Sequence, residues 1–164
     1  MTFPTKQELT HELVLLMTRE LDVLEQNHRD TAAAATHEEA KPENDKDTRA
    51  LEQSYLARGQ ALRVQEVREQ IARVRSTGIE APSGDAATLG SIVTVFDEHD
   101  EAERTFFLMP AGGGSRLAER EGRSVLVVTP ESPWGRALVG AKVGESREVT
   151  IAGRLRDFEV RAVR

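Results

Sequence analysis

Two long stretches without helix-breaking residues constrain this chain more than any other feature of its sequence. The first runs from Lys6 to about His28 and has apolar residues at the four-then-three spacing of a coiled-coil seam. The second runs from Asn44 to Ser76 and is interrupted only by Gly59. A helix of that length is about 45 Å long, more than a compact domain of this size needs. The two stretches therefore predict two helices that pack against each other as an antiparallel α-helical coiled-coil hairpin.

Each predicted helix has an apolar stripe along one side, which the hairpin would bury. The stripe residues are Leu9, Leu13, Leu16, Val23 and Leu24 in the first helix and Ala57, Ala61, Val64, Ile71 and Val74 in the second. The alanine run from Ala32 to Ala35 also favours a helix, so we expect the first helix to continue almost to Thr36.

The chain changes character after residue 78. Pro82, Gly84 and Gly90 end the helical periodicity and predict a linker over residues 79–90. Beyond the linker come five short segments that are rich in β-branched or aromatic residues: SIVTVFD, RTFFLM, SVLVVTP, SREVTI and FEVRAV. Segments of this kind, bounded by Gly, Pro, Asp or Glu, predict strands.

One short helix is predicted between the third and fourth strands. Ser132 is expected as its N-cap, Pro133 as its first residue and Gly140 as its C-terminal stop. The fold expected is α+β, with a helical hairpin over residues 1–78 and an antiparallel sheet with one helix over residues 91–164.

The composition narrows the classes of protein to be considered. The chain of 164 residues is 38% hydrophobic and 30% charged, and it has no apolar run of membrane-spanning length. It has no cysteine, which excludes disulfides and thiolate zinc sites, and we expect a cytoplasmic protein. The net charge of −6 disfavours tight non-specific DNA binding, so a protein or metal partner is expected.

Acidic residues gather in HEEAKPENDKD, residues 37–47, at the turn of the predicted hairpin. Asn44 as N-cap and Asp47 three residues later suit the start of the second helix, and Asp45 suits the positive end of its dipole. The remaining acids have no such local role and are candidates for function: Glu38, Glu39 and Glu43.

The stretch SPWGRALVGAKVGES, residues 132–146, resembles the signature of the bacterial Gre factors, S-P-[LIW]-[GA]-R-A-L-[LIV]-G followed by K-x-G-[DE]. The order of hairpin, linker and small sheet domain is similar as well. The resemblance implies an FKBP-like sheet domain that docks at the rim of the RNA polymerase secondary channel, with the hairpin running toward the catalytic magnesium. It makes Ser132, Pro133, Trp134 and Arg136 candidate partner-binding residues, although a core position is the better expectation for Trp134.

The hairpin turn differs from the family pattern. Cleavage factors of this family have a tip close to G-D-L-K-E-N, whose two acids help to hold a second magnesium ion. Here EAKPEN takes that place, so Glu43 and Asn44 match the second acid and the asparagine, while the first acid falls on Ala40. The resemblance makes Glu39 and Glu43 candidate ligands of a Mg²⁺ ion shared with the polymerase, with no cofactor of the chain's own. It makes Glu38 and Asn44 candidate partner-binding residues.

The hypothesis that results is a polymerase accessory factor, not itself an enzyme, that modulates catalysis rather than cleaving RNA. It would meet nascent RNA or DNA only through the polymerase complex, and no membrane partner is expected. Transcript cleavage through the tip carboxylates is the alternative. A peptidyl-prolyl isomerase is remoter because only 4% of the residues are aromatic, and a plain coiled-coil adaptor would not require an acidic tip. The sequence leaves the oligomeric state open.

Overall fold

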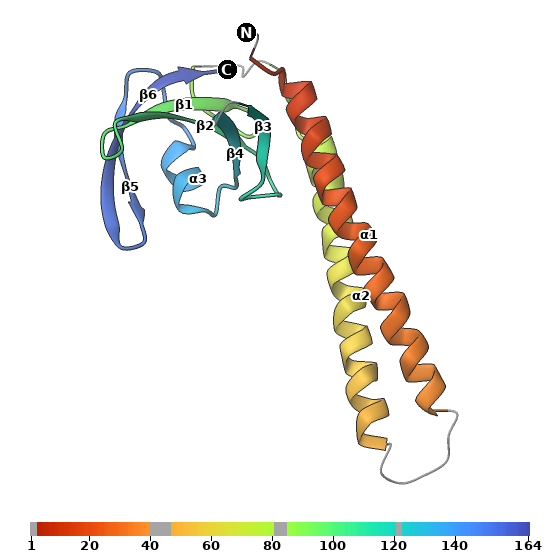
Figure 1. Ribbon diagram of the computed structural model, residues 1–164. Coiled ribbons are helices and arrows are strands. Elements are labelled where there is room, and N and C mark those ends of the chain that lie inside the picture. Colours follow the sequence, from red (N-terminus) through yellow and green to blue (C-terminus); the bar gives the residue numbers. More distant parts are fainter. Residues whose placement is uncertain (1–2, 40–46, 81–84, 121–122) are drawn as a thin grey trace. The chain divides into compact units, whose positions relative to one another are not determined.

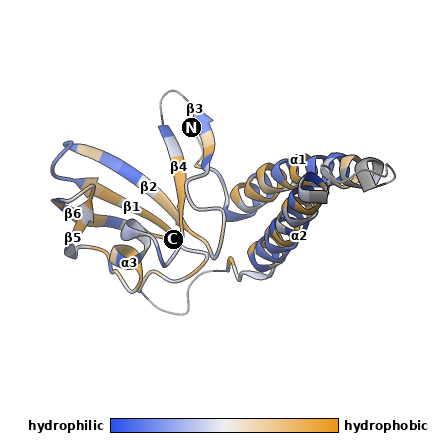
Figure 2. Ribbon diagram, turned by 90° about the horizontal axis from the view of Figure 1, so that it is seen from below, coloured by the Kyte–Doolittle hydropathy of each residue, from blue (hydrophilic) through white to orange (hydrophobic). Residues whose placement is uncertain are grey.

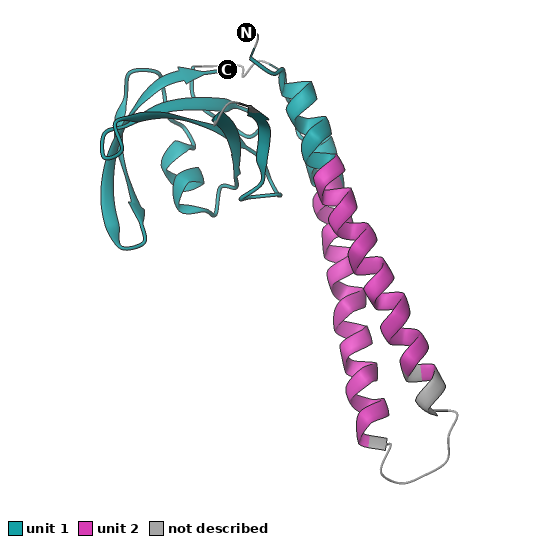
Figure 3. Cartoon of the chain, viewed as in Figure 1, with its two compact units in different colours: residues 1–14, 72–164 teal, residues 15–71 magenta. Residues whose placement is uncertain are grey.

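The computed structural model describes residues 3–39, 47–80, 85–120 and 123–164, and it divides into two compact units. The sheet unit comprises residues 1–14 and 72–164, and the hairpin unit comprises residues 15–71 (Figure 3). The N-terminal end of the first long helix and the C-terminal end of the second therefore belong to the sheet unit. The domain boundaries predicted from the sequence stay a prediction.

Two long helices form the N-terminal part of the chain, α1 over Lys6–Glu39 and α2 over Asp47–Ser76 (Figure 1). Helix α1 begins at a capping box, because the Thr5 hydroxyl accepts from the Glu8 N–H at 3.2 Å and the Glu8 carboxylate accepts from the Thr5 N–H at 2.7 Å. Both predicted helices are confirmed, although the predicted cap Asn44 lies outside the described residues. Within the residues that the structure describes, no helix combines the length and the hydrophobicity that a membrane span requires.

The buried apolar side chains of these helices are Leu9, Leu13 and Met17 on α1 and Val64, Val67, Ile71 and Val74 on α2. The stripes predicted from the sequence differ at two positions. Val23 is 60% exposed and Ala61 is exposed, whereas Leu16, Leu24 and Ala57 are half-buried. The difference in α2 arises because its inward positions keep a strict three-and-four spacing, which brings Gln60 inward in place of Ala61. Apolar character alone did not reveal this register.

The C-terminal part of the chain is a six-stranded sheet with the strand order β3-β4-β2-β1-β6-β5 (Figure 1). The strands are β1 (Ile92–Asp97), β2 (Ala102–Leu108), β3 (Arg116–Arg120), β4 (Arg123–Val128), β5 (Ser146–Ile151) and β6 (Arg154–Val163). With the short helix α3 (Pro133–Leu138), these elements confirm the predicted α+β fold.

One strand pairing corrects the expectation of an antiparallel sheet. Strands β2 and β4 run parallel, whereas the other neighbouring strands run antiparallel. The cause is β3, which the sequence did not predict because its RLAER stretch is short and mostly polar. This extra strand adds a second reversal between β2 and β4, so the chain returns beside β2 in the same direction as β2. The sheet is therefore mixed.

The main core lies between one face of the sheet and α3. Its buried members are Ala87, Val93, Val95, Phe106, Leu108, Val128, Leu138, Ala141, Val149, Phe158 and Val160. Figure 2 shows the apolar residues concentrated along β1 and β4, as expected for strands that a helix and neighbouring strands cover. This core holds α3 in place.

The first turns of α1 are fastened to the sheet within the sheet unit. The Glu12 carboxylate accepts hydrogen bonds from the Ala118 N–H at 3.0 and 3.2 Å, at the point where β3 departs from regular pairing. Gly112, at φ +79°, packs directly against Leu13, because a Cβ at this position would lie 2.7 Å from a methyl carbon of that side chain. These contacts combine a charged hydrogen bond with close apolar packing.

Candidate functional site

The acidic turn of the hairpin is only partly described by the structure. Glu38 and Glu39 lie in the last turn of α1, and the positions of their side chains are not described. Ala40, Glu43 and Asn44 lie outside the described residues. Within the described residues, no group of three His, Asp or Glu side chains could hold a metal ion. The assignment of Glu39 and Glu43 as magnesium ligands therefore stays a prediction.

The second candidate region is α3, whose first turn is built around Ser132. The Ser132 hydroxyl accepts the Gly135 N–H at 3.0 Å and donates to the Thr129 carbonyl at 2.7 Å. Pro133 follows as the first helical residue, where its missing N–H costs nothing. The predicted N-cap and helix start are thus confirmed, and Ser132 has a clear structural task.

Gly135 allows α3 to approach the preceding loop closely. A Cβ at this position would lie 1.8 Å from the carbonyl oxygen of Thr129, far inside van der Waals contact. Only glycine therefore fits at position 135 in this packing. This steric limit explains why this chain has glycine at the [GA] position of the signature.

Trp134 anchors α3 to the sheet. Its ring centroid lies 4.5 Å from that of Phe106 on β2 and 5.2 Å from that of Phe158 on β6. Both phenylalanines are buried, and Trp134 itself is half-buried. The tilted ring arrangements are favourable for aromatic pairs. The expectation that Trp134 belongs with the core agrees with this packing.

The C-terminus of α3 is capped by an arginine from β5. The Arg147 guanidinium donates to the carbonyls of Ala137 at 3.0 Å, Val139 at 3.1 Å and Gly140 at 3.0 Å. Glu145 accepts from Arg147 Nε at 2.9 Å and so holds the guanidinium in place. The Lys142 N–H, followed by Arg147, keeps the pKa of Glu145 below its usual range. A cation suits the negative end of a helix dipole.

Four residues of this region have exposed side chains. Pro133 and Arg136 of α3 are exposed, as are Val139 and Val143 just after the helix. We call these four residues the α3 surface. The predicted partner-binding residues Pro133 and Arg136 lie on it. Ser132 caps the helix and Trp134 packs it against the sheet. A positive charge beside apolar side chains is a common composition for a protein-binding patch.

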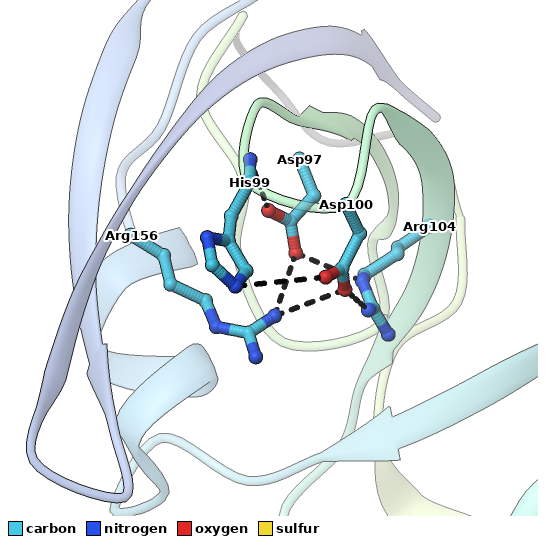
Figure 4. A network of polar contacts seen from close by, with 5 residues as sticks. All are labelled: Asp97, His99, Asp100, Arg104 and Arg156. Carbon is cyan, nitrogen blue, oxygen red and sulfur yellow. Dashed lines mark hydrogen bonds and ion pairs between the residues drawn. The ribbon is translucent and has the colours of Figure 1, made fainter.

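A polar network at the β1–β2 turn was not predicted from the sequence (Figure 4). Asp97 at the end of β1 is completely buried and accepts from the His99 N–H at 3.1 Å, Arg104 Nε at 3.0 Å and Arg156 Nη1 at 3.3 Å. Asp100 accepts from Arg104 and, at 3.0 Å, from Arg156. The hydrogen bond from Arg104 lowers the pKa of Asp100. Because each arginine is matched by a carboxylate, the network ties the turn to β6 and leaves no excess charge for a ligand.

Comparisons with known proteins identify the relatives of this chain. A family model described as transcription elongation factor GreA/GreB, C-terminal part, matches residues 81–164. Transcription elongation factor GreA of Maricaulis maris (strain MCS10) is 32% identical over 101 residues, which cover 62% of this chain and 60% of that protein. GreA of Rhodospirillum rubrum is 33% identical over 102 residues, with the same coverage of 62% and 60%. The chain thus matches about 60% of the length of these curated relatives.

Solved structures of similar proteins were found as well. Gfh1 of Thermus aquaticus has a TM-score of 0.38 and 15% identity, covering 90% of each chain. GreA/GreB from Nitrosomonas europaea has a TM-score of 0.37 and 18% identity, covering 59% of this chain and 78% of that chain. The family match covers just over half of the sequence and includes the whole SPWGRALVG signature. The chain therefore belongs to the GreA/GreB family of transcription elongation factors.

Proposed function

We propose that this protein binds RNA polymerase through its sheet unit and places the acidic turn of its hairpin in the secondary channel, where it modulates catalysis without cleaving RNA. The observation that carries the proposal is the family match over residues 81–164, which includes the complete α3 signature. The two long helices support it, because at 1.5 Å per residue a 34-residue helix reaches about 50 Å. Contact with RNA or DNA is indirect in this proposal.

The α3 surface is the part that we propose to contact the polymerase. Pro133, Val139 and Val143 offer apolar area, and Arg136 offers a planar cation that pairs well with a carboxylate. The buried supports of α3 hold the helix and the residues that follow it in place, so little conformational entropy is lost on binding. A matching partner surface would have an apolar centre and an acidic group at its edge.

The absence of cleavage is proposed from the composition of the turn. The family's first tip acid falls on Ala40, which leaves Glu43, and Glu39 after a shift of one residue, as the carboxylates closest to that pattern. Mg²⁺ demands near-ideal octahedral geometry, so a carboxylate displaced by one residue is a poor replacement. Misplacement of about 1 Å can reduce a rate about 100-fold. The turn keeps its negative charge while it lacks the family's pair of acids.

Two experiments test the proposal. Purified core RNA polymerase should retain this protein, and Arg136→Glu should weaken retention at least tenfold, whereas Arg154→Glu, an exposed arginine elsewhere on the sheet unit, should not. Failure of the wild-type protein to bind polymerase would remove the proposal.

The second experiment uses a backtracked elongation complex. The wild-type protein should release little short 3′ RNA and should slow nucleotide addition when present in excess. Efficient release that is lost in Glu43→Ala would establish the cleavage alternative instead. Ala40→Asp restores the family's first acid and should increase release if the turn otherwise has the family's geometry.

A further inference from the structure

The seam of the hairpin unit changes character along its length. In the base, residues 15–20 and 63–71, the buried apolar side chains are Met17, Val64, Val67 and Ile71. In the distal half, residues 21–36 and 48–62, none of the described apolar side chains is buried. The half-buried inward positions there are Leu21, Leu24, His28 and Thr31 on α1 and Ala50, Gln53, Ala57 and Gln60 on α2.

Three polar side chains of this distal seam each have one atom that is left without a hydrogen-bond partner when the hairpin is closed. His28 Nδ1, Gln53 Oε1 and Gln60 Oε1 are each buried without a hydrogen-bond partner. A buried polar atom that lacks a partner is destabilising, because it gives up its hydrogen bond to water and receives nothing in exchange. Separation of the two helices would return these three atoms to water. The closed distal half therefore contains little apolar burial and several desolvated polar atoms.

Large apolar side chains of the distal half point outward instead. Leu51, Tyr55 and Leu62 lie on the side of α2 opposite its inward positions, and they are between 55% and 66% exposed. Rotation of α2 by roughly half a turn would bring them into the seam. That rotation is blocked because α2 is one continuous helix over Asp47–Ser76, whose register is set by the apolar residues of the base. The base thus imposes a polar seam on the distal half.

The ion pairs that join the two helices lie close to the base. Arg63 Nη2 is 3.3 Å from Glu20 Oε1, and Arg68 Nη2 is 2.6 Å from Glu25 Oε1. Both arginine side chains are about half exposed, so each pair is screened by salt and contributes little. These pairs do not compensate for the unsatisfied seam beyond them.

We propose that the hairpin has two zones, a base that stays closed and a distal half in which α1 and α2 separate locally and reversibly while the base remains packed. Local opening of this kind is expected where little apolar surface is buried. It would allow the distal half to adjust to the surface of a binding partner. The proposal rests on the seam alone and holds whether or not the partner is RNA polymerase.

Hydrogen exchange of the full chain, followed by mass spectrometry, tests the two zones. Amides of residues 21–36 and 48–62 should exchange at least tenfold faster than those of residues 64–71. Fraying of the helices from the hairpin turn would also produce a gradient in exchange rate. Variants of the seam distinguish fraying from the effect of the polar seam. Gln53→Leu with Gln60→Leu should slow exchange in the distal half at least tenfold, because the seam becomes apolar.

The matched control is Gln65→Leu, which makes the same chemical change on the exposed side of α2 and should leave distal exchange unchanged. The absence of cysteine in the chain permits a second measurement with pairs of spin labels. Labels at Gln26 and Leu62 should give a broad distance distribution that narrows in the double leucine variant, whereas labels at Arg19 and Glu69 should give a narrow one throughout. Equal exchange in the two zones, or distal exchange that the double variant does not slow, would overturn the proposal.

Discussion

Removal of the buried carboxylate of Asp97 should weaken the sheet unit through the loss of several interactions at once. This carboxylate is completely buried, and it accepts hydrogen bonds from the His99 N–H, Arg104 and Arg156 at 3.0 to 3.3 Å. In Asp97→Ala these donors lose their acceptor, and Arg156, whose Nε is already buried without a partner, loses one of its two carboxylates. The change therefore disrupts several interactions together.

The expected cost follows from the exposure of the arginines. Removing one partner of a fully buried ion pair costs about 3–5 kcal/mol. Here the Arg104 and Arg156 side chains are 42% and 20% exposed, so both can regain water, and we expect the lower limit of about 3 kcal/mol. Asp97→Asn keeps the volume and one acceptor for the His99 N–H but removes the charge. Its cost should be about 1.5 kcal/mol, in the range of a lost charged hydrogen bond.

Trp134 provides the assay, because it is the only tryptophan and packs within the sheet unit. Urea unfolding followed by its fluorescence should rank the free energies of unfolding as wild type, Asp97→Asn and Asp97→Ala, in decreasing order. Glu103→Gln, at an exposed carboxylate on β2, is the matched control and should change the free energy by less than about 0.5 kcal/mol. If Asp97→Ala unfolds within that margin of wild type, the network contributes no net stability and the reasoning is wrong.

Three further predictions concern the sheet unit and α2. Gly135→Ala would place a carbon 1.8 Å from the Thr129 carbonyl oxygen and should lower the free energy of unfolding by about 3 kcal/mol. Gly59→Ala, where a Cβ has no atom within 4 Å, should stabilise α2 by up to about 1 kcal/mol. Thermal unfolding followed by circular dichroism measures both changes. Ser132→Ala should cost about 1 kcal/mol in the fluorescence assay through loss of its cap, and a neutral result would show that the cap is not needed. Folding lowers the pKa values of Asp100 and Glu145, so their contribution to stability is complete only above a pH of about 5.5, well above the unfolded-state pKa values of about 4. It declines as the pH falls toward the lowered values. Urea midpoints measured from pH 7 to pH 3 should fall, and a constant midpoint would contradict the proton linkage.

The sequence was sufficient for features that depend on local chemistry. Breaker-free stretches predicted α1 and α2, and the order of Ser132, Pro133 and Gly140 predicted α3 with its cap and its positive-φ stop. These signals are local because a helix forms its backbone hydrogen bonds between residues only four positions apart. The sequence was insufficient where the outcome depends on register. Val23 and Ala61 are apolar and point outward because residues elsewhere in the helices set the register.

The Asp97 network shows the same limit for polar residues. In sequence, Asp97 and Asp100 belong to an acidic turn that resembles a solvated loop, and Arg156 is 59 positions away from Asp97. Only the pairing of β1 with β6, interrupted by a register shift between Thr94 and Val95, brings that arginine to the carboxylate. A register shift is a consequence of packing across strands, and a single sequence contains no local sign of it.

The residues that identify the family and the residues to which we assign the proposed activity lie in different parts of the chain. Ser132, Gly135 and Leu138 of the signature are accounted for by the cap, the close approach and the core of α3. Similarity in the α3 signature indicates that the sheet unit folds and exposes the α3 surface. It gives no information on the chemistry of the hairpin turn. Under the proposed function, the alanine at position 40 would leave docking intact while it alters the chemistry that the turn can support. A protein built in this way would compete with a cleavage-competent relative for the same polymerase, and Ala40→Asp should change the outcome of that competition without changing the affinity.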